Sequence, residues 1–91
     1  MSVKERIDEL LENNKVVLFM KGTPDFPQCG FSSKAVALLR AAQAEEFHTV
    51  NVLDDQDIRQ GIKDYSDWPT VPQLYINQQF IWRERYHAGS L

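Results

Sequence analysis

The 91-residue sequence has little cysteine, no excess of basic charge and no long apolar stretch. Its one cysteine, Cys29, excludes an internal disulfide and leaves a thiol that is either inert or functional. Ten Lys and Arg residues against thirteen Asp and Glu residues give a net charge of -3. Because the basic residues are also scattered along the chain, nucleic acid is not an expected partner. The longest apolar run, residues 16–20, is too short to span a bilayer, so no membrane partner is expected either.

What remains is the composition of a folded domain. Hydrophobic residues make up 43% of the chain and charged residues 25%, which disfavours disorder. Domains commonly have about 100 to 150 residues, so we predict that residues 1–91 form one domain. The first residues lack the apolar segment of a signal peptide and include acidic side chains, which disfavours a secretory or transit peptide. The expected compartment is the cytoplasm, or the mitochondrial matrix or a plastid if a leader has been removed.

Three segments have the apolar spacing of amphipathic helices. The first follows a capping-box pair, Ser2 and Glu5, in which each side chain can bond the backbone N–H of the other residue. Ser32 or Ser33 is placed to cap the second helix. The predicted helices cover residues 3–13, about 31 or 32 to 44, and 56–65.

Four short segments predict strands. Residues 16–20 are apolar without interruption, which is typical of a central strand covered on both faces. Residues 47–53 alternate, and the helix that precedes them predicts a parallel pairing with the first strand. Residues 73–76 and 80–82 predict a hairpin, although residues 77–79 lack the Asn-Gly pair of a tight primed turn. The order of elements predicts an α/β fold with a central mixed sheet of about four strands flanked by helices.

Cys29 lies in a Pro- and Gly-rich loop, residues 21–30, between the first strand and the second helix. Backbone N–H groups at a helix N-terminus and the nearby ammonium group of Lys21 stabilise a thiolate relative to a thiol. The sequence therefore predicts a lowered pKa for Cys29 and a role as nucleophile or metal ligand. The alternative is an inert filler of the core, which is the commoner state of a lone cysteine in a small protein.

Three motifs resemble those of the monothiol, or CGFS-type, glutaredoxins in order and spacing. The motifs are Lys-Gly-Thr-Pro at residues 21–24, Pro-Gln-Cys-Gly-Phe-Ser at residues 27–32, and Trp-Pro-Thr-Val-Pro-Gln at residues 68–73. The similarity extends from the first helix through Phe80. It implies a thioredoxin-like fold and favours the functional thiol over the inert one.

The resemblance implies that Cys29 binds a metal cluster together with glutathione. In this family the cysteine and the thiol of a bound glutathione ligate a [2Fe-2S] cluster that bridges two protomers. One thiolate in each chain cannot complete a shell of four thiolates, whereas two cysteines and two glutathiones can. The resemblance thus implies a cluster-bound homodimer that carries clusters in their assembly and delivery and in iron homeostasis. It also suggests BolA-type proteins and iron-sulfur client proteins as partners.

The resemblance also implies which residues bind glutathione. Lys21 would contact glutathione near its sulfur, and Arg59 would pair with its glycine carboxylate, which the planar guanidinium fits. The alternative for both is a solvated surface charge. Thr70, Val71 and Pro72 resemble the family's cis-proline loop, in which Val71 pairs its N–H and C=O with the peptide of glutathione.

The residue at position 32 is serine rather than a second cysteine. Cys29 therefore has no neighbour to resolve a mixed disulfide, and any turnover needs an external thiol. We predict a cluster carrier first and, as the alternative, at most a weak glutathione-dependent oxidoreductase with Cys29 as the catalytic residue. For Ser32 the alternative role is a helix cap, and Trp68 is expected to pack in the core.

The sequence departs from the family pattern after Ile81. Members usually carry Gly-Gly, then Cys or Ser, then Asp before the last helix, whereas here Ile81 runs directly into Trp82. We therefore expect a truncated or altered last helix, with Trp82 covering apolar core. The missing segment normally binds the γ-glutamyl end of glutathione, so its loss would weaken binding. A non-catalytic interaction module is the alternative function.

Overall fold

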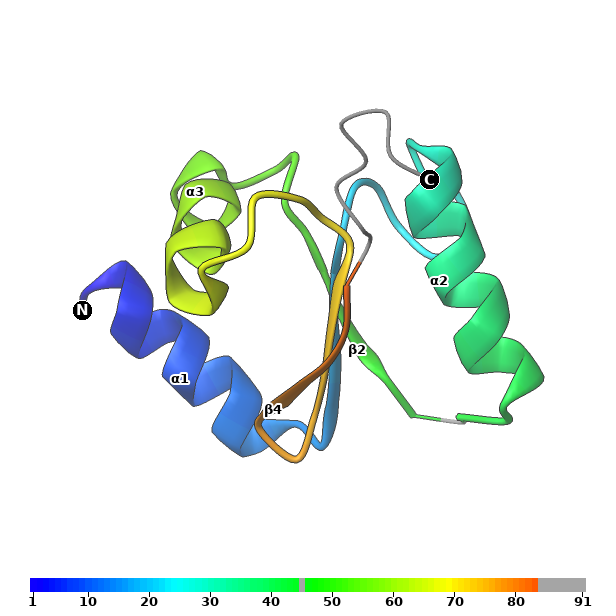
Figure 1. The fold of residues 1–91 in the computed structure, drawn as a ribbon, viewed down its shortest axis with the longest axis horizontal. Coiled ribbons are helices and arrows are strands. Elements are labelled where there is room, and N and C mark those ends of the chain that lie inside the picture. The colour runs from blue at the N-terminus through cyan, green and yellow to red at the C-terminus, as the bar shows by residue number, and fades with distance from the viewer. Residues whose placement is uncertain (45, 84–91) are drawn as a thin grey trace.

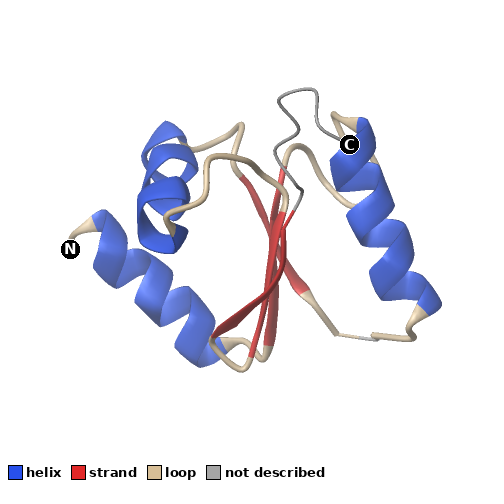
Figure 2. Ribbon diagram, viewed as in Figure 1, coloured by secondary structure: helices blue, strands red, loops and turns tan. Residues whose placement is uncertain are grey.

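The computed structural model describes residues 1–44 and 46–83, which form a three-layer arrangement. The elements are α1 (Val3–Asn13), β1 (Val16–Met20), α2 (Gly30–Ala41), β2 (His48–Asn51), α3 (Gln56–Ser66), β3 (Gln73–Ile76) and β4 (Gln79–Arg83). The strands form one mixed sheet, with α1 and α3 on one face and α2 on the other (Figures 1 and 2). The predicted α/β fold with a central sheet flanked by helices is confirmed.

The strand order is β2-β1-β3-β4. β1 pairs in parallel with β2, so that Met20 faces Asn51 at the C-terminal end of both strands. β3 runs antiparallel to β1 and pairs Gln73 with Phe19, and β4 runs antiparallel to β3. The predicted parallel pair and hairpin are therefore confirmed. The ends of β1 and β2 and the start of β3 lie at the same edge of the sheet.

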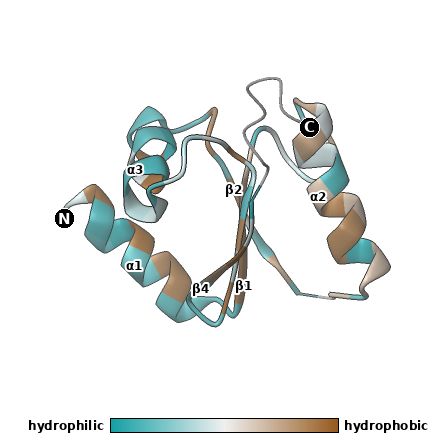
Figure 3. Ribbon diagram, in the orientation of Figure 1, coloured by the Kyte–Doolittle hydropathy of each residue, from teal (hydrophilic) through white to brown (hydrophobic). Residues whose placement is uncertain are grey.

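β1 supplies buried side chains to both faces of the sheet. Val17 and Phe19 belong to the apolar cluster under α1 and α3, and Leu18 and Met20 belong to the cluster under α2. All four are fully buried, as the uninterrupted apolar run predicts, and each such side chain contributes roughly 1.5 to 3 kcal/mol. Trp82 packs against the α2-side cluster, as expected. Figure 3 shows hydrophobic residues on both helical layers.

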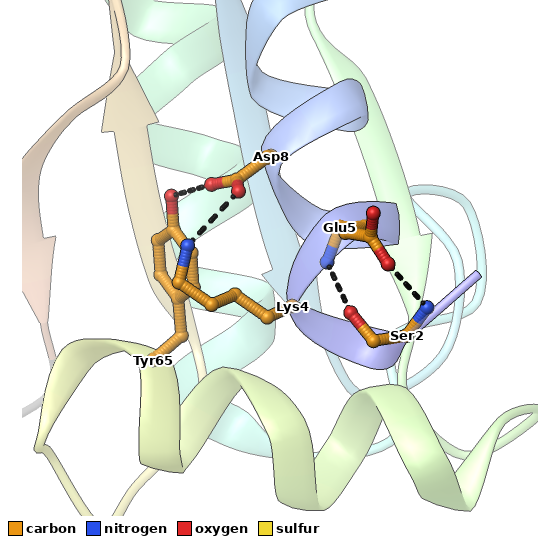
Figure 4. A network of polar contacts seen from close by, with 5 residues as sticks. All are labelled: Ser2, Lys4, Glu5, Asp8 and Tyr65. Atoms are coloured by element: carbon orange, nitrogen blue, oxygen red, sulfur yellow. Dashed lines mark hydrogen bonds and ion pairs between the residues drawn. The ribbon is translucent and has the colours of Figure 1, made fainter.

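α1 begins with the predicted capping box (Figure 4). The N–H of Glu5 donates to the hydroxyl of Ser2 at 3.1 Å, and the N–H of Ser2 donates to the carboxylate of Glu5 at 2.9 Å. One residue further on, Arg6 forms an ion pair of 2.5 Å with Asp55, which is the N-cap of α3. The hydrogen bond from Arg6, with those from the first turn of α3, lowers the pKa of Asp55. These contacts join the starts of the two helices.

α2 begins and ends earlier than predicted. Its N-cap is Cys29, so the prediction that Ser32 or Ser33 caps the helix is wrong. Cys29 has extended backbone angles, and its sulfur accepts the N–H of Ser32. The helix therefore begins at Gly30 rather than at residue 31 or 32. The helix ends at Ala41 rather than at residue 44, because Gln43 adopts a left-handed conformation with φ 59°.

β2 is shorter than the predicted strand, residues 47–53. The chain turns away directly after Asn51, whose side-chain oxygen accepts the N–H of Leu53 at 3.0 Å. The carbonyl of Asn51 also accepts the N–H of Asp54 at 3.1 Å. This local hydrogen bonding of an Asn side chain competes with strand pairing and ends the strand.

The β3–β4 hairpin has a tight two-residue turn, Asn77 and Gln78. Both residues have positive φ, 50° and 67° respectively, as a primed turn requires. Asn tolerates this region well, so the turn forms although its second residue is not glycine. Ile76 and Gln79 face each other across it.

The predicted truncated or altered last helix lies beyond residue 83, outside the described residues. No helix within the described ranges has both the length and the apolar character needed to cross a membrane.

Candidate functional site

Three connections meet at one edge of the sheet (Figure 1). They are residues 21–29 between β1 and α2, residues 52–55 between β2 and α3, and residues 67–72 between α3 and β3. The parallel pairing of β1 with β2 and the antiparallel pairing of β1 with β3 bring them together. Five of the residues that the sequence singled out lie on these connections, which are Lys21, Cys29, Thr70, Val71 and Pro72. The sixth, Arg59, lies in the first turn of α3, which follows the second connection.

The loop before Cys29 is folded back on itself. The N–H of Gln28 donates to the carbonyl of Lys21 at 2.8 Å, and Gly22 and Pro27 form an isolated bridge. Gly22 has φ 93°, and a Cβ atom there would lie 2.5 Å from the carbonyl oxygen of Phe26. Only glycine fits this position, because both the backbone conformation and the space exclude a side chain. The fold-back carries the chain from the end of β1 to the start of α2.

Cys29 is partly exposed and makes two contacts with Ser32. Its sulfur accepts the N–H of Ser32 at 3.3 Å, and the hydroxyl oxygen of Ser32 lies 3.3 Å from the same sulfur. Ser32 is fully buried, and its hydroxyl oxygen accepts the backbone N–H of Lys21 at 3.0 Å. A thiolate sulfur can only accept, so the hydroxyl of Ser32 is the donor in this contact when Cys29 is ionised. The serine joins the start of α2 to the end of β1 at the thiol.

The pKa of the Cys29 thiol is lowered from its ordinary value. Partial burial alone would raise this pKa, since it disfavours the charged form. The hydrogen bonds from the hydroxyl and N–H of Ser32, and from the N–H of Phe31, outweigh it, and the charge of Lys21 adds to them. The thiolate at this helix start is therefore favoured relative to a free cysteine, as the sequence predicted.

The two predicted cations, Lys21 and Arg59, are both half-buried. Lys21 is half-buried directly after β1, where its charge acts on Cys29. Arg59 is half-buried near the start of α3, and its N–H donates to the carbonyl of Asp55 at 2.9 Å. Within the part of the chain that the structure describes, the guanidinium of Arg59 forms no ion pair. A fixed backbone and an uncommitted guanidinium suit a residue that pairs with a carboxylate.

The third connection contains a cis peptide bond between Val71 and Pro72, as the resemblance implied. The side chains of both residues are buried. The N–H and C=O of Val71 form no hydrogen bond with another residue in the described ranges. Trp68 was expected in the core, but it is half-buried and belongs to neither apolar cluster. The guanidinium of Arg83 lies 4.0 Å from the centroid of its ring.

Two side-chain amides at this edge, those of Asn51 and Gln73, were not predicted from the sequence. Asn51 accepts the N–H of Gly22 at 2.9 Å besides that of Leu53, and so links the first two connections. Gln73 is fully buried and donates to the carbonyl of Thr70 at 3.1 Å in the third connection. The sequence shows only that Asn51 lies near the end of a predicted strand and that Gln73 belongs to the third motif. It does not show which groups the two amides bond, because these groups are backbone atoms of other residues.

The described residues offer one sulfur ligand for a metal ion. Within residues 1–44 and 46–83, no group of three or more His, Cys, Asp or Glu side chains is placed to hold one. Cys29 is the one cysteine of the chain, so it can supply a single thiolate ligand. Among the described residues, this donor fits a cluster that is shared with other thiols better than a metal site enclosed by those residues.

A family model for glutaredoxin matches residues 16–81. This chain belongs to the glutaredoxin family. It is 48% identical over 81 residues to monothiol glutaredoxin-5, mitochondrial, of Saccharomyces cerevisiae, covering 87% of this chain and 54% of that protein. It is 50% identical over 94 residues to monothiol glutaredoxin-S14, chloroplastic, of Arabidopsis thaliana, covering 98% of this chain and 54% of that protein. The glutaredoxin is thus of the monothiol type, and it spans about half the length of these relatives.

A solved structure confirms the thioredoxin-like fold. The reduced apo form of GrxS14 from poplar superposes with a TM-score of 0.72 at 51% identity, covering 86% of this chain and 71% of that one. The fold of this glutaredoxin was therefore predicted correctly from its motifs and the order of its elements.

Proposed function

We propose that this glutaredoxin binds glutathione beside Cys29 and that two copies share a [2Fe-2S] cluster, which they carry to other proteins. The observation that carries the proposal is the state of Cys29. Its thiol is partly exposed at a helix start, its pKa is lowered, and the described residues add no second set of metal ligands. A thiolate that needs partners from outside the chain suits a cluster held between molecules.

In the proposed site, glutathione lies along the edge formed by the three connections. Lys21 contacts it near the sulfur, Arg59 pairs with its glycine carboxylate, and Val71 pairs with its peptide as a short added strand. The unpaired backbone groups of Val71 and the uncommitted guanidinium of Arg59 support this placement. Thr70 and Pro72 complete the same loop. Each charge-assisted hydrogen bond would contribute about 1.5 to 3 kcal/mol.

Anaerobic reconstitution tests the cluster. The full chain is incubated with iron, sulfide and glutathione, and its visible spectrum and hydrodynamic size are measured. We expect a brown dimer with wild type and a colourless monomer with Cys29→Ser or without glutathione. Ser33→Ala is the matched control, because Ser33 is exposed on the same helix turn and keeps every ligand. A wild-type protein that stays colourless and monomeric would contradict the proposal.

The second candidate is a weak glutathione-dependent oxidoreductase. Cys29 thiolate would attack the glutathione sulfur of a mixed disulfide, releasing the target thiolate and leaving glutathione disulfide-bonded to Cys29. A second glutathione thiolate would then attack this disulfide and leave as oxidised glutathione, regenerating the Cys29 thiolate. The lack of a second cysteine makes the second step intermolecular. Turnover above that of Cys29→Ser supports this activity, and its absence excludes it.

The third candidate function is a non-catalytic interaction module, because the sequence departs from the family pattern after Ile81. The resemblance implies that the missing segment binds part of glutathione, so its loss would reduce the affinity for glutathione. A glutathione titration followed by the melting temperature decides the matter. A rise in melting temperature supports glutathione binding, and no change at millimolar glutathione favours the interaction module.

Partners and compartment belong to the same proposal. We expect residues 1–91 to act as one domain that meets a second copy, BolA-type proteins and iron-sulfur clients through the edge around Cys29. The relatives from S. cerevisiae and A. thaliana are mitochondrial and chloroplastic by name, which supports the organelle alternatives to the cytoplasm. All three compartments keep the thiol reduced.

A further inference from the structure

Gln73, the first residue of β3, is a fully buried amide directly behind the Thr70–Pro72 loop. Its Nε2 donates to the carbonyl of Thr70 at 3.1 Å and lies 3.5 Å from the carbonyl of Trp68. Buried polar side chains are costly unless they are hydrogen-bonded. The Gln73 amide meets this condition through carbonyl groups of the preceding connection, which an apolar side chain could not bond.

The orientation of the Gln73 amide is fixed from both ends. Two carbonyl oxygens face one end of it, and only the NH₂ group can bond to them. Its Oε1 then faces the hydroxyl of Tyr75, which donates to it at 3.2 Å. The Tyr75 ring is itself held by Phe19 at 5.7 Å and by Phe80 at 5.0 Å between centroids. The amide of Gln73 thus connects the packed ring of Tyr75 to the Thr70–Pro72 loop.

We propose that Gln73 is a positioning residue for glutathione, holding the loop so that the N–H and C=O of Val71 are presented to the tripeptide. The inference rests on the proposed function and adds a residue that does not touch the ligand. Val71 lies between Thr70, whose carbonyl Gln73 holds, and Pro72, which is buried next to Gln73. Fixing the carbonyl on one side and the buried ring on the other orders the backbone between them before glutathione arrives. Such pre-ordering raises affinity by lowering the entropy lost on binding.

The test replaces Gln73 by methionine, which keeps the length and volume of the side chain and removes both hydrogen-bonding groups. Binding of reduced glutathione to the full chain is measured by calorimetry at a temperature where every variant is folded. We expect the Kd of Gln73→Met to rise about tenfold, because the loop must then be ordered on binding. The rate of Cys29 alkylation by iodoacetamide should stay at the wild-type value, since Gln73 bonds to no atom of the Cys29 loop.

The matched control is Gln79→Met, the same change at an exposed position of β4. It should bind glutathione as the wild type does. A purely structural role for Gln73 would lower the melting temperature but leave the Kd unchanged in the folded protein, and this result would overturn the inference. If the wild type itself fails to bind glutathione, the proposed function fails, which separates that outcome from a wild-type Kd in Gln73→Met.

A second variant covers the case in which Gln73→Met does not fold. Tyr75→Phe keeps the aromatic ring and its packing but removes the hydroxyl that orients Oε1 of Gln73. Weaker glutathione binding by Tyr75→Phe, with unchanged Cys29 alkylation, supports the role of Gln73. A wild-type Kd in this variant would overturn it.

Discussion

The hydroxyl oxygen of Ser32 lies 3.3 Å from the sulfur of Cys29. The same oxygen accepts the backbone N–H of Lys21, and Ser32 is completely buried. Ser32, in the first turn of α2, therefore acts on the thiol from the buried side, while Cys29 itself stays partly exposed. The motif serine is thus part of the chemistry of the cysteine and not a helix cap.

Ser32→Ala should shift the pKa of Cys29 upward. The variant loses the hydroxyl hydrogen bond, which is the largest of the contributions that lower this pKa. The rate of alkylation by iodoacetamide, measured against pH, should therefore reach its midpoint at a higher pH than in the wild type. Ser33→Ala, an exposed neighbour, should leave the profile unchanged. An unshifted profile in Ser32→Ala would show that the hydroxyl does not stabilise the thiolate.

The same variant has a pH-dependent effect on stability. A thiol whose pKa is lower in the folded protein contributes stability above its unfolded pKa and loses it as the pH falls through the folded pKa. Ser32→Ala should therefore cost more stability at alkaline pH than at acidic pH. A further cost of about 1 to 3 kcal/mol should persist at every pH, because the part-buried N–H of Lys21 loses its acceptor. Urea unfolding at several pH values measures both parts.

Gly61→Ala should test how closely α3 approaches α1. A Cβ atom at Gly61 would overlap Cγ1 of Val3, whose β-branched side chain has little rotamer freedom in a helix. Overpacking costs about 1 to 3 kcal/mol, against a gain of about 1 kcal/mol from replacing a helical glycine. Alone, the substitution should be neutral to destabilising, and in a Val3→Ala background it should stabilise. The coupling free energy comes from urea unfolding of the two single variants and the double variant.

Gly30→Ala is the control for this cycle, because a Cβ atom there meets nothing within 4 Å. It should be stabilising by a few tenths to about 1 kcal/mol and should not couple to Val3→Ala. Additive effects of Gly61→Ala and Val3→Ala would show that the two helices have room to separate.

The sequence predicted the features that depend on neighbouring residues. The capping box of Ser2 and Glu5 formed because both partners lie within one turn. The predicted start of α2 was wrong, because serine is a usual N-cap residue whereas the N-cap here is Cys29. The tight primed turn at Asn77 was not predicted, because its second residue is Gln78 rather than glycine. Local rules fail where a less common residue can adopt the required geometry.

The candidate site was predictable only as far as its motifs. Cys29 and the Val71–Pro72 bond could be placed because their motifs are distinctive, and the structure brings them to one edge of the sheet. Asn51 and Gln73 were not identified, because each bonds to backbone groups that any residue provides. Only the folded chain shows which backbone atoms lie within reach.

Asn51→Leu should loosen the loop before Cys29. The side-chain oxygen of Asn51 accepts the N–H groups of Gly22 and Leu53, at 2.9 Å and 3.0 Å, so leucine leaves both without this acceptor. We expect a loss of about 1 to 3 kcal/mol in the free energy of unfolding and faster hydrogen exchange at Gly22. Asn51→Asp retains an acceptor oxygen of the same shape and should keep slow exchange there. Equal exchange rates in Asn51→Leu and the wild type would show that the contact does not hold the loop.

Tyr65→Phe should release Asp8 from its strongest partner. The hydroxyl of Tyr65 donates to the carboxylate of Asp8 at 2.6 Å, and Lys4 bonds the other oxygen at 3.1 Å (Figure 4). The Tyr65 hydrogen bond is the largest cause of the lowered pKa of Asp8, so this pKa should rise toward its ordinary value in Tyr65→Phe. Lys4→Met, which removes the second hydrogen bond and the charge of Lys4, should also raise it. Carboxyl NMR titrations of the three proteins measure both shifts.

The tyrosine end of this contact predicts the opposite pH dependence. Burial, followed by the hydrogen bond to Asp8, raises the pKa of Tyr65 to about 12. Because the folded pKa is the higher one, this contribution to stability is complete below the unfolded pKa and is lost as the pH rises through the folded value. The stability difference between wild type and Tyr65→Phe should therefore shrink between pH 10 and 12. Absorbance titration at alkaline pH should show one late-ionising tyrosine fewer in Tyr65→Phe, whereas loss of an early-ionising one would mean that the contact does not form in solution.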